Sequence, residues 1–243
     1  MRMDSPAVRG SDSVHRVLEA ELAAARERAT GKPRVVDVGG GSGVWAVPLA
    51  AAGCAVTVVE PNPNAIATLW RRAEEVAVAE NIEVIADDVD ALADVIPAGS
   101  ADLVLAHGLL EVVDDPAAAL AALAATVADD GAVSVLVANR HAAVLHRALS
   151  GRFDEARKLL ADPDGVLPED AEALLRRFDV DGLRTLLAAA GLRVSRLLGD
   201  GIVADWVADP GEGELAEFEL AAAGTPPLRD IASRLHVVAR RAG

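Results

Sequence analysis

The stretch Val35-Val-Asp-Val-Gly-Gly-Gly-Ser-Gly43 decides the fold, because a short apolar run leads directly into four glycines. The run at 34–38 predicts a buried strand, and a helix is expected at 43–52. Glycine lets the backbone turn sharply and lets a ligand approach without a Cβ in the way. A helix N-terminus adds unpaired N–H groups and a positive dipole. The stretch therefore predicts a strand–loop–helix unit that binds a ligand.

Glu60 lies at the end of the next expected strand, 55–59, and follows Gly41 by 19 residues. A carboxylate at this point can accept hydrogen bonds from both hydroxyls of a ribose. The strand, the glycines, the helix, the second strand and its terminal acid together predict a nucleoside site. Two ligand classes fit such a site, dinucleotides and S-adenosylmethionine (SAM).

Outside this unit, apolar strands alternate with helical segments. Strands are expected at 34–38, 55–59, 82–86, 101–106, 132–138, 192–203 and 234–239, and a turn at 130–131. Helices are expected at 12–29, 43–52, 63–80, 116–128, 140–149, 153–161, 180–190 and 213–222, with a short one after 226–227. This alternation is typical of an α/β fold with a parallel sheet covered on both faces. We expect a single domain over 1–243, with an N-terminal helical segment at 1–30 and a helical insertion, serving as a substrate cap, at 140–178.

The composition excludes several classes of protein. The chain has 243 residues with 52% apolar and 2% aromatic residues, which excludes a disordered acidic chain. No apolar run approaches ~18 residues, so no membrane span is expected. The stretch 1–10 lacks the apolar core of a secretory signal. One cysteine, Cys54, excludes a disulfide framework and a multi-cysteine zinc site, and no metal is expected. We expect a soluble, cytoplasmic protein.

The net charge of −15 is concentrated in one block. Residues 73–139 carry 14 acids and neither Lys nor Arg, so this block should repel polyanions, or it is a solvated face that aids solubility. A basic island follows at 140–158. Its cations are Arg140, Arg147, Arg152, Arg157 and Lys158, and it also contains His141 and His146. The island could bind a carboxylate or phosphates, or it could be the wet side of amphipathic helices.

Two positions distinguish the ligand classes. The dinucleotide fingerprint expects Gly or Ala at position 44, where this chain has Val44, and an apolar residue where it has Asp37. The pattern of Asp37, Gly39, Gly41 and Gly43 resembles motif I of the class I SAM-dependent methyltransferases. That resemblance implies SAM as the cofactor and a Rossmann-like, mostly parallel seven-stranded sheet with strand order 3-2-1-4-5-7-6. A dinucleotide-dependent oxidoreductase and a non-catalytic SAM-binding protein remain the alternatives.

The same resemblance implies a set of cofactor-binding residues. They are the loop residues Asp37, Gly39, Gly40 and Gly41, the ribose ligand Glu60, the adenine-contacting residues Asp87, Asp88 and Val89, and His107. His107 ends an expected strand, so we expect it to contact the cofactor or the substrate. Asp37 could instead be a buried acid that organises the loop.

A narrower resemblance begins after the fifth expected strand. Asn139-Arg-His141, Leu145-His146 and Gly151-x-Phe153-Asp154 resemble the bacterial tRNA methyltransferases that esterify 5-carboxymethoxyuridine. That group implies that Arg9 holds the SAM carboxylate. The substrate-binding candidates are Asn139, Arg140, His141 and Arg147, and the candidates for a general base are His107, His141 and His146. A carboxylate acceptor needs no base.

One stretch departs from the tRNA-modifying group. Residues 161–172 contain five acids and no base. Binding of RNA depends strongly on neutralising its phosphates. The methyl acceptor is therefore expected to be either tRNA or a small carboxylate, and the oligomeric state is not predicted.

Overall fold

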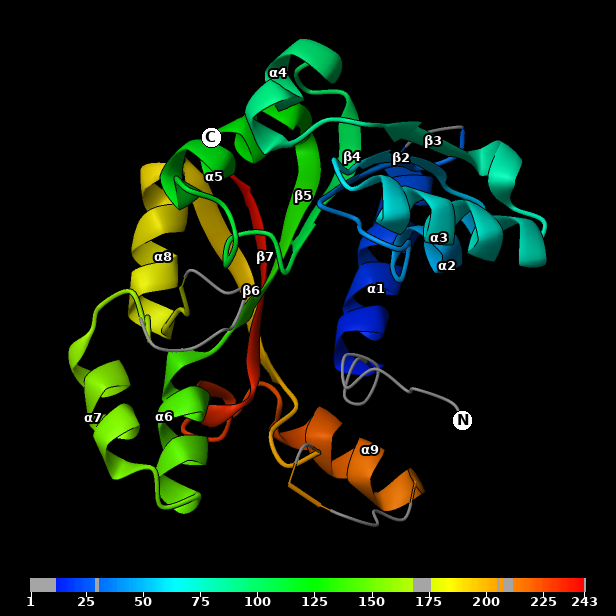
Figure 1. Ribbon diagram of the computed structural model, residues 1–243. Coiled ribbons are helices and arrows are strands. Elements are labelled where there is room, and N and C mark those ends of the chain that lie inside the picture. Colours follow the sequence, from blue (N-terminus) through cyan, green and yellow to red (C-terminus); the bar gives the residue numbers. More distant parts are fainter. Residues whose placement is uncertain (1–11, 29–30, 168–175, 205, 208–211, 243) are drawn as a thin grey trace.

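A seven-stranded sheet organises the chain, with strand order β3-β2-β1-β4-β5-β7-β6 (Figure 1). The computed structural model describes residues 12–28, 31–167, 176–204, 206–207 and 212–242. The strands are β1 (Arg34–Val38), β2 (Ala55–Val59), β3 (Ile82–Ile85), β4 (Ala101–His107), β5 (Val127–Ala138), β6 (Leu192–Asp200) and β7 (Arg234–Arg241). The first five pair in parallel, and β7 runs antiparallel to both β5 and β6. The expected fold class and strand order are confirmed.

Helices cover both faces of the sheet (Figure 1). One layer contains α1 (Asp12–Arg28), α2 (Ala46–Ala51) and α3 (Pro63–Glu75), and the other contains α4 (Leu92–Val95), α5 (Pro116–Thr126) and α8 (Val180–Ala189). Strand alternation divides the core between them. Leu103 and Leu105 of β4 belong to the cluster with α1, α2 and α3, whereas Val104 and Ala106 belong to the cluster with α5 and α8.

Three further helices lie beyond the carboxyl ends of the parallel strands (Figure 1). They are α6 (Arg140–Leu149), α7 (Phe153–Ala161) and α9 (Glu212–Ala222). The chain also forms short 3₁₀ helices, which are η2 (Ala79–Asn81), η3 (Val89–Ala91) and η4 (Arg229–Ile231). No helix in the part of the chain that the structure describes is long and apolar enough to cross a membrane.

Local side chains explain where several helices begin. The side-chain oxygens of Asn62, Asp115 and Asp179 accept backbone N–H groups in the first turns of α3, α5 and α8. Such N-caps satisfy donors that the helix itself leaves unpaired. Pro63 and Pro116 occupy the first helical positions, where a missing N–H has no cost.

The strand expected at 192–203 ends earlier, at Asp200, and the helix expected at 43–52 begins later, at Ala46. Two other expected elements differ more. The helix expected at 63–80 ends at Glu75, because Ala77 adopts a left-handed conformation with φ 56° that cannot continue a helix. The turn expected at 130–131 is part of β5, in the irregular stretch between two paired segments of that strand. A Cβ on Gly131 would lie 2.9 Å from the carbonyl oxygen of Ala101, so the close approach of β4 explains this glycine.

The packing between α5 and the sheet predicts a strong effect of Leu120→Ala. Leu120 is fully buried, so its truncation should lower the free energy of unfolding by about 2–5 kcal/mol. Leu160→Ala on α7 is the control, because that side chain is 60% exposed and its loss should cost less than about 0.5 kcal/mol. Urea denaturation followed by circular dichroism measures both changes, and equal midpoints would contradict the described packing.

Candidate functional site

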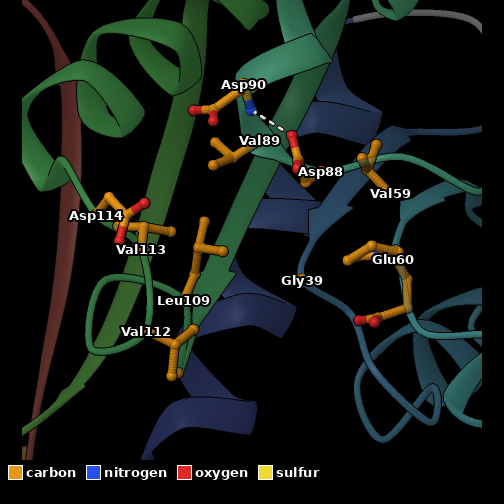
Figure 2. A pocket seen from close by; sticks show the side chains of 12 residues that line it. Gly39, Val59, Glu60, Asp88, Val89, Asp90, Leu109, Val112, Val113 and Asp114 are labelled. Atoms are coloured by element: carbon orange, nitrogen blue, oxygen red, sulfur yellow. Dashed lines mark hydrogen bonds between the residues drawn. The ribbon is translucent and has the colours of Figure 1, made fainter. Parts of the chain in front are cut away.

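A cleft opens where the loops leave β1, β2, β3 and β4 (Figure 2). Its volume is about 330 Å³. Its described lining consists of Gly39, Val59, Glu60, Pro61, Asp88, Val89, Asp90, Gly108, Leu109, Val112, Val113 and Asp114. The carboxyl edge of a parallel sheet is where α/β folds bind ligands, so this cleft is the candidate functional site.

The lining has one apolar side and several carboxylates. Leu109, Val112 and Val113 lie across the cleft from Glu60 (Figure 2). The acids are Glu60, Asp88, Asp90 and Asp114, and the lining contributed by described residues contains no basic side chain. An apolar wall suits the face of a flat ring, and carboxylates suit hydroxyl and amine donors and a positive charge. The cleft therefore fits an adenosine that bears a cationic sulfur.

Glu60 joins two loops of the site. One carboxylate oxygen accepts the N–H of Gly41 at 2.9 Å, and the other accepts the N–H of Asn62 at 2.8 Å. Gly41 has a φ of +55°, a conformation that glycine adopts without strain. A carboxylate has about four lone-pair sites, so each oxygen retains capacity for one more donor, such as a ribose hydroxyl.

Asp37 lies beneath the glycine loop and is 1% exposed. Its Oδ2 is buried without a hydrogen-bond partner among the described residues, and a Cβ on Gly40 would lie 2.7 Å from it. Burial, and then the charge of Glu60, raises the pKa of Asp37 to about 7. Asp37 and Gly40 are therefore packed against each other under the loop, while Gly39 of the same loop lines the cleft.

The loop after β3 contributes two of its three predicted residues to the cleft. Asp88 and Val89 line it, and Asp87 does not appear in the lining. The Asp88 carboxylate accepts the N–H of Asp90 at 3.0 Å and so caps η3. Asp87 accepts the N–H of Asp88 at 3.0 Å. The backbone geometry of this loop is thus fixed by its own acids.

His107 points away from the cleft, toward the α1 side of the sheet. Its Nε2 lies 2.9 Å from the Ser134 hydroxyl, which lies 2.8 Å from Nε2 of His236. Its ring meets Trp45 edge-on, with centroids 4.8 Å apart. Strand parity places residue 107 on the same face as Leu105. Burial, followed by nearby positive groups, holds the pKa of His107 well below its usual value, and burial lowers the pKa of His236 to about 3.

The candidates on α6 are largely engaged within the protein. Asn139 is 2% exposed, accepts the N–H of His141 at 3.0 Å and donates to the carbonyl oxygen of Ala232 at 2.7 Å. Arg140 forms an ion pair with Asp179, and Arg147 lies 3.4 Å from a carboxylate oxygen of Glu155. These contacts tie α6 to its neighbours. His141 is half-buried and His146 is exposed on the same helix.

Some site residues escaped the sequence analysis, and one lies outside the structure described. Leu109, Val112, Val113 and Asp114 line the cleft, although their neighbour His107 is the only residue of this stretch that the sequence predicts for the site. Their place in the stretch 106–116, which leaves an expected strand, is the signal that could have indicated them. Arg9, expected to hold the SAM carboxylate, lies outside the described residues.

The strand order, the glycine loop and the acid after β2 define the class I SAM-dependent methyltransferases. Residues 12–197 match the family described as "Methyltransferase domain". The chain belongs to this family and is a SAM-dependent methyltransferase, as the sequence predicts. SAM is its cofactor, so the dinucleotide alternative is not supported.

Curated relatives match part of the chain. The tRNA 5-carboxymethoxyuridine methyltransferase of Escherichia coli (strain K12) is 32% identical over 126 residues, which are 51% of this chain and 47% of the relative. The protein of the same name from Escherichia coli O157:H7 matches to the same extent. The chain thus spans about half the length of the curated relatives it matches.

Solved structures share the fold over nearly the whole chain. A SAM-dependent methyltransferase from Mesorhizobium loti superposes with a TM-score of 0.60 at 20% identity, covering 91% of this chain and 98% of that one. Magnesium protoporphyrin IX methyltransferase from Synechocystis, solved with bound SAH, gives 0.59 at 15% identity, covering 94% and 84%. The [4+2]-cyclase SpnF gives 0.60 at 15% identity, covering 93% and 80%. The fold therefore does not by itself fix the reaction.

The raised pKa of Asp37 predicts a pH-dependent effect of Asp37→Asn. The folded state favours protonated Asp37, so its contribution to stability falls as pH rises from the unfolded pKa of 3.8 toward about 7. The melting temperature of the Asp37→Asn variant relative to wild type should therefore increase between about pH 5 and 7 and change little from there to about pH 8, measured without ligand.

Asp102→Asn is the control for this measurement. Burial acts to raise the pKa of Asp102, but hydrogen bonds and charge from Arg34 outweigh it and lower the pKa below 3.8. The carboxylate is then ionised in both states across the tested range, so this variant should lose stability by an amount that does not change with pH. A pH-independent difference for Asp37→Asn as well would contradict the assignment.

Proposed function

We propose that the protein transfers a methyl group from SAM to a carboxylate oxygen, and that the acceptor is 5-carboxymethoxyuridine in tRNA. The observation that carries this proposal is the 32% identity, over half of the chain, to relatives named for that reaction. The motifs from Asn139 to Asp154 support the same acceptor, since they resemble that group.

The proposed cofactor site uses the cleft. SAM, when bound, supplies a methyl group on a positively charged sulfur. Gly39 and its loop would approach the methionine part, Glu60 would accept from the ribose hydroxyls, and the Asp88–Val89 backbone and side chain would meet the adenine edge. The acidic lining around Glu60 favours the positive charge of this cofactor.

A carboxylate acceptor agrees with the surroundings of His107, one of the candidates for a general base. A carboxylate is already ionised at neutral pH, so no residue has to remove a proton. His107 is a poor base, because burial keeps its pKa well below 6.5 and its Nε2 contacts Ser134. The role of the protein is then alignment of the two reactants, which contributes about 7–11 kcal/mol in well-oriented systems.

A small carboxylate is the second candidate acceptor. It is favoured because arginines of the basic island are paired with acids of the same protein. Arg140 pairs with Asp179, and Arg147 and Arg152 share Glu155. Arg157 lies 3.4 Å from an oxygen of Asp154. Cations that are neutralised within the protein contribute less to binding phosphates.

The ribose assignment predicts a loss of cofactor affinity in Glu60→Gln. A charged hydrogen-bond acceptor contributes about 1.5–3 kcal/mol, so the dissociation constant of SAH should rise roughly ten- to a hundredfold. Isothermal titration calorimetry measures this constant. Glu83→Gln, an exposed acid on β3 outside the cleft, should bind as wild type does. An unchanged affinity in Glu60→Gln would refute the assignment.

Incubation with methyl-labelled SAM tests the acceptor. The proposal predicts label in tRNA that carries 5-carboxymethoxyuridine, released by mild alkali because methyl esters hydrolyse. Label that enters a metabolite extract instead would favour the small carboxylate. Alkali-stable label would indicate another nucleophile and contradict the carboxylate, and no label in either sample would favour a protein that binds SAM without turnover.

A further inference from the structure

A second pocket lies on the remaining half of the sheet edge. Its volume is about 260 Å³, and its described lining comes from the end of β5, from α6, from the residue before β7 and from the segment after β6. The cleft described above is formed by the ends of β1 to β4. The two sites therefore divide the same edge, which is the arrangement that a transfer between two bound reactants requires.

The pocket has an aromatic wall built from distant parts of the chain. Trp206 and His146 pack edge to face, with ring centroids 5.7 Å apart and an interplanar angle of 76°. Trp206 is 37% exposed and His146 is also exposed, so both rings are accessible to a ligand. Exposed aromatic rings in a pocket stack on flat heterocycles. The other two tryptophans of the chain, Trp45 and Trp70, are half-buried, so Trp206 is the exposed indole.

Small side chains leave room in front of this wall. Ala138, Ala142 and Ala143 line the pocket at the end of β5 and the first turn of α6. A volume of about 260 Å³ lies near the lower end of the ~300–1,000 Å³ typical of small-molecule sites. It accommodates one ring with a short substituent.

The charge of this pocket is opposite to that of the cleft. Arg177 lines it, is 6% exposed, donates from Nη1 to the carbonyl oxygen of Gly165 at 2.9 Å and has a further interaction within the protein, so it acts on the pocket through its charge. The residues that the structure places in this lining include no acid, whereas the cleft lining contains four. A buried guanidinium favours a negatively charged ligand group.

We propose that this pocket is the methyl-acceptor site and that it takes a planar heterocycle carrying a carboxylate. Trp206 and His146 hold the ring, the three alanines set its size, and Arg177 supplies the positive potential for the carboxylate. The inference rests on the proposed function, since it assigns the acceptor of that reaction to this pocket, to which Arg177 is contributed by the segment before α8.

Calorimetry with the free nucleoside 5-carboxymethoxyuridine tests the proposal, using full-length protein saturated with SAH. Trp206→Ala removes the stacking ring, and Ala143→Leu fills the pocket with a residue that favours a helix. Each should weaken nucleoside binding by about tenfold or more. Trp206→Phe should retain most of the affinity. Unmodified uridine, which lacks the carboxylate, should bind at least about tenfold more weakly than the probe.

Two matched variants and the SAH affinity serve as controls. Val207→Ala changes the next exposed residue, and Ala148→Leu makes the same substitution elsewhere on α6; neither residue lines the pocket. Both should bind the nucleoside as wild type does. Every variant should bind SAH normally, which shows that the fold and the cleft are intact.

Several results would overturn the inference. They are absence of nucleoside binding to wild type, wild-type affinity in both Trp206→Ala and Ala143→Leu, or equal binding of uridine and the probe. Labelled tRNA with an unchanged KM in Trp206→Ala would reject the pocket but retain the proposed function. Trp206-dependent binding of the nucleoside without any labelling of tRNA would reject the proposed function but retain the pocket.

Discussion

The site depends on a single carboxylate that connects two loops. Glu60 accepts the N–H of Gly41 from the β1 loop and the N–H of Asn62 from the loop after β2. Asn62 then caps α3 through its own side chain, so one hydrogen-bonded chain links the glycine loop to the start of the next helix. After burial, the negative charge of Glu60 also contributes to the raised pKa of Asp37 beneath the loop. Any change at Glu60 therefore alters the shape of the loop as well as the chemistry of the cleft.

The structure shows where part of the net negative charge of the chain lies. Asp88, Asp90 and Asp114, three of the four acids in the cleft, come from the block 73–139 that carries 14 acids and no base. Part of that acidity therefore lines the cleft. The basic island at 140–158 differs from this acidic block, because Arg140 and Arg147 are paired with carboxylates of the same protein. Neither feature can be interpreted from net charge alone.

Features within one strand–loop–helix unit could be predicted from the sequence, and contacts between distant segments could not. The apolar runs predicted every strand of the sheet. The spacing of Gly41 and Glu60 predicted that both residues belong to one site, and in the structure they are joined by a hydrogen bond. The pairing of Arg140 with Asp179 and of His146 with Trp206 depends on how helices fold back over the sheet edge, which no local pattern encodes. The sequence correctly predicted that His107 lies at the end of a strand. Its side chain contacts Ser134 because alternate residues of a strand face opposite sides of the sheet, and residue 107 faces the side away from the cleft.

The antiparallel course of β7 has a consequence for how such a protein can change. Because β7 enters the sheet at the edge where β5 and β6 end, the β5–β6 and β6–β7 connections meet there, and none of their described residues lines the cleft. Arg176 of the β5–β6 connection donates to the carbonyl oxygens of Val113 and Asp114 in the loop after β4, so mutations in these connections leave that contact intact only where they spare Arg176. With the acceptor in the proposed pocket, selection for a new acceptor can act on one half of the sheet edge while the half that binds the cofactor stays constant.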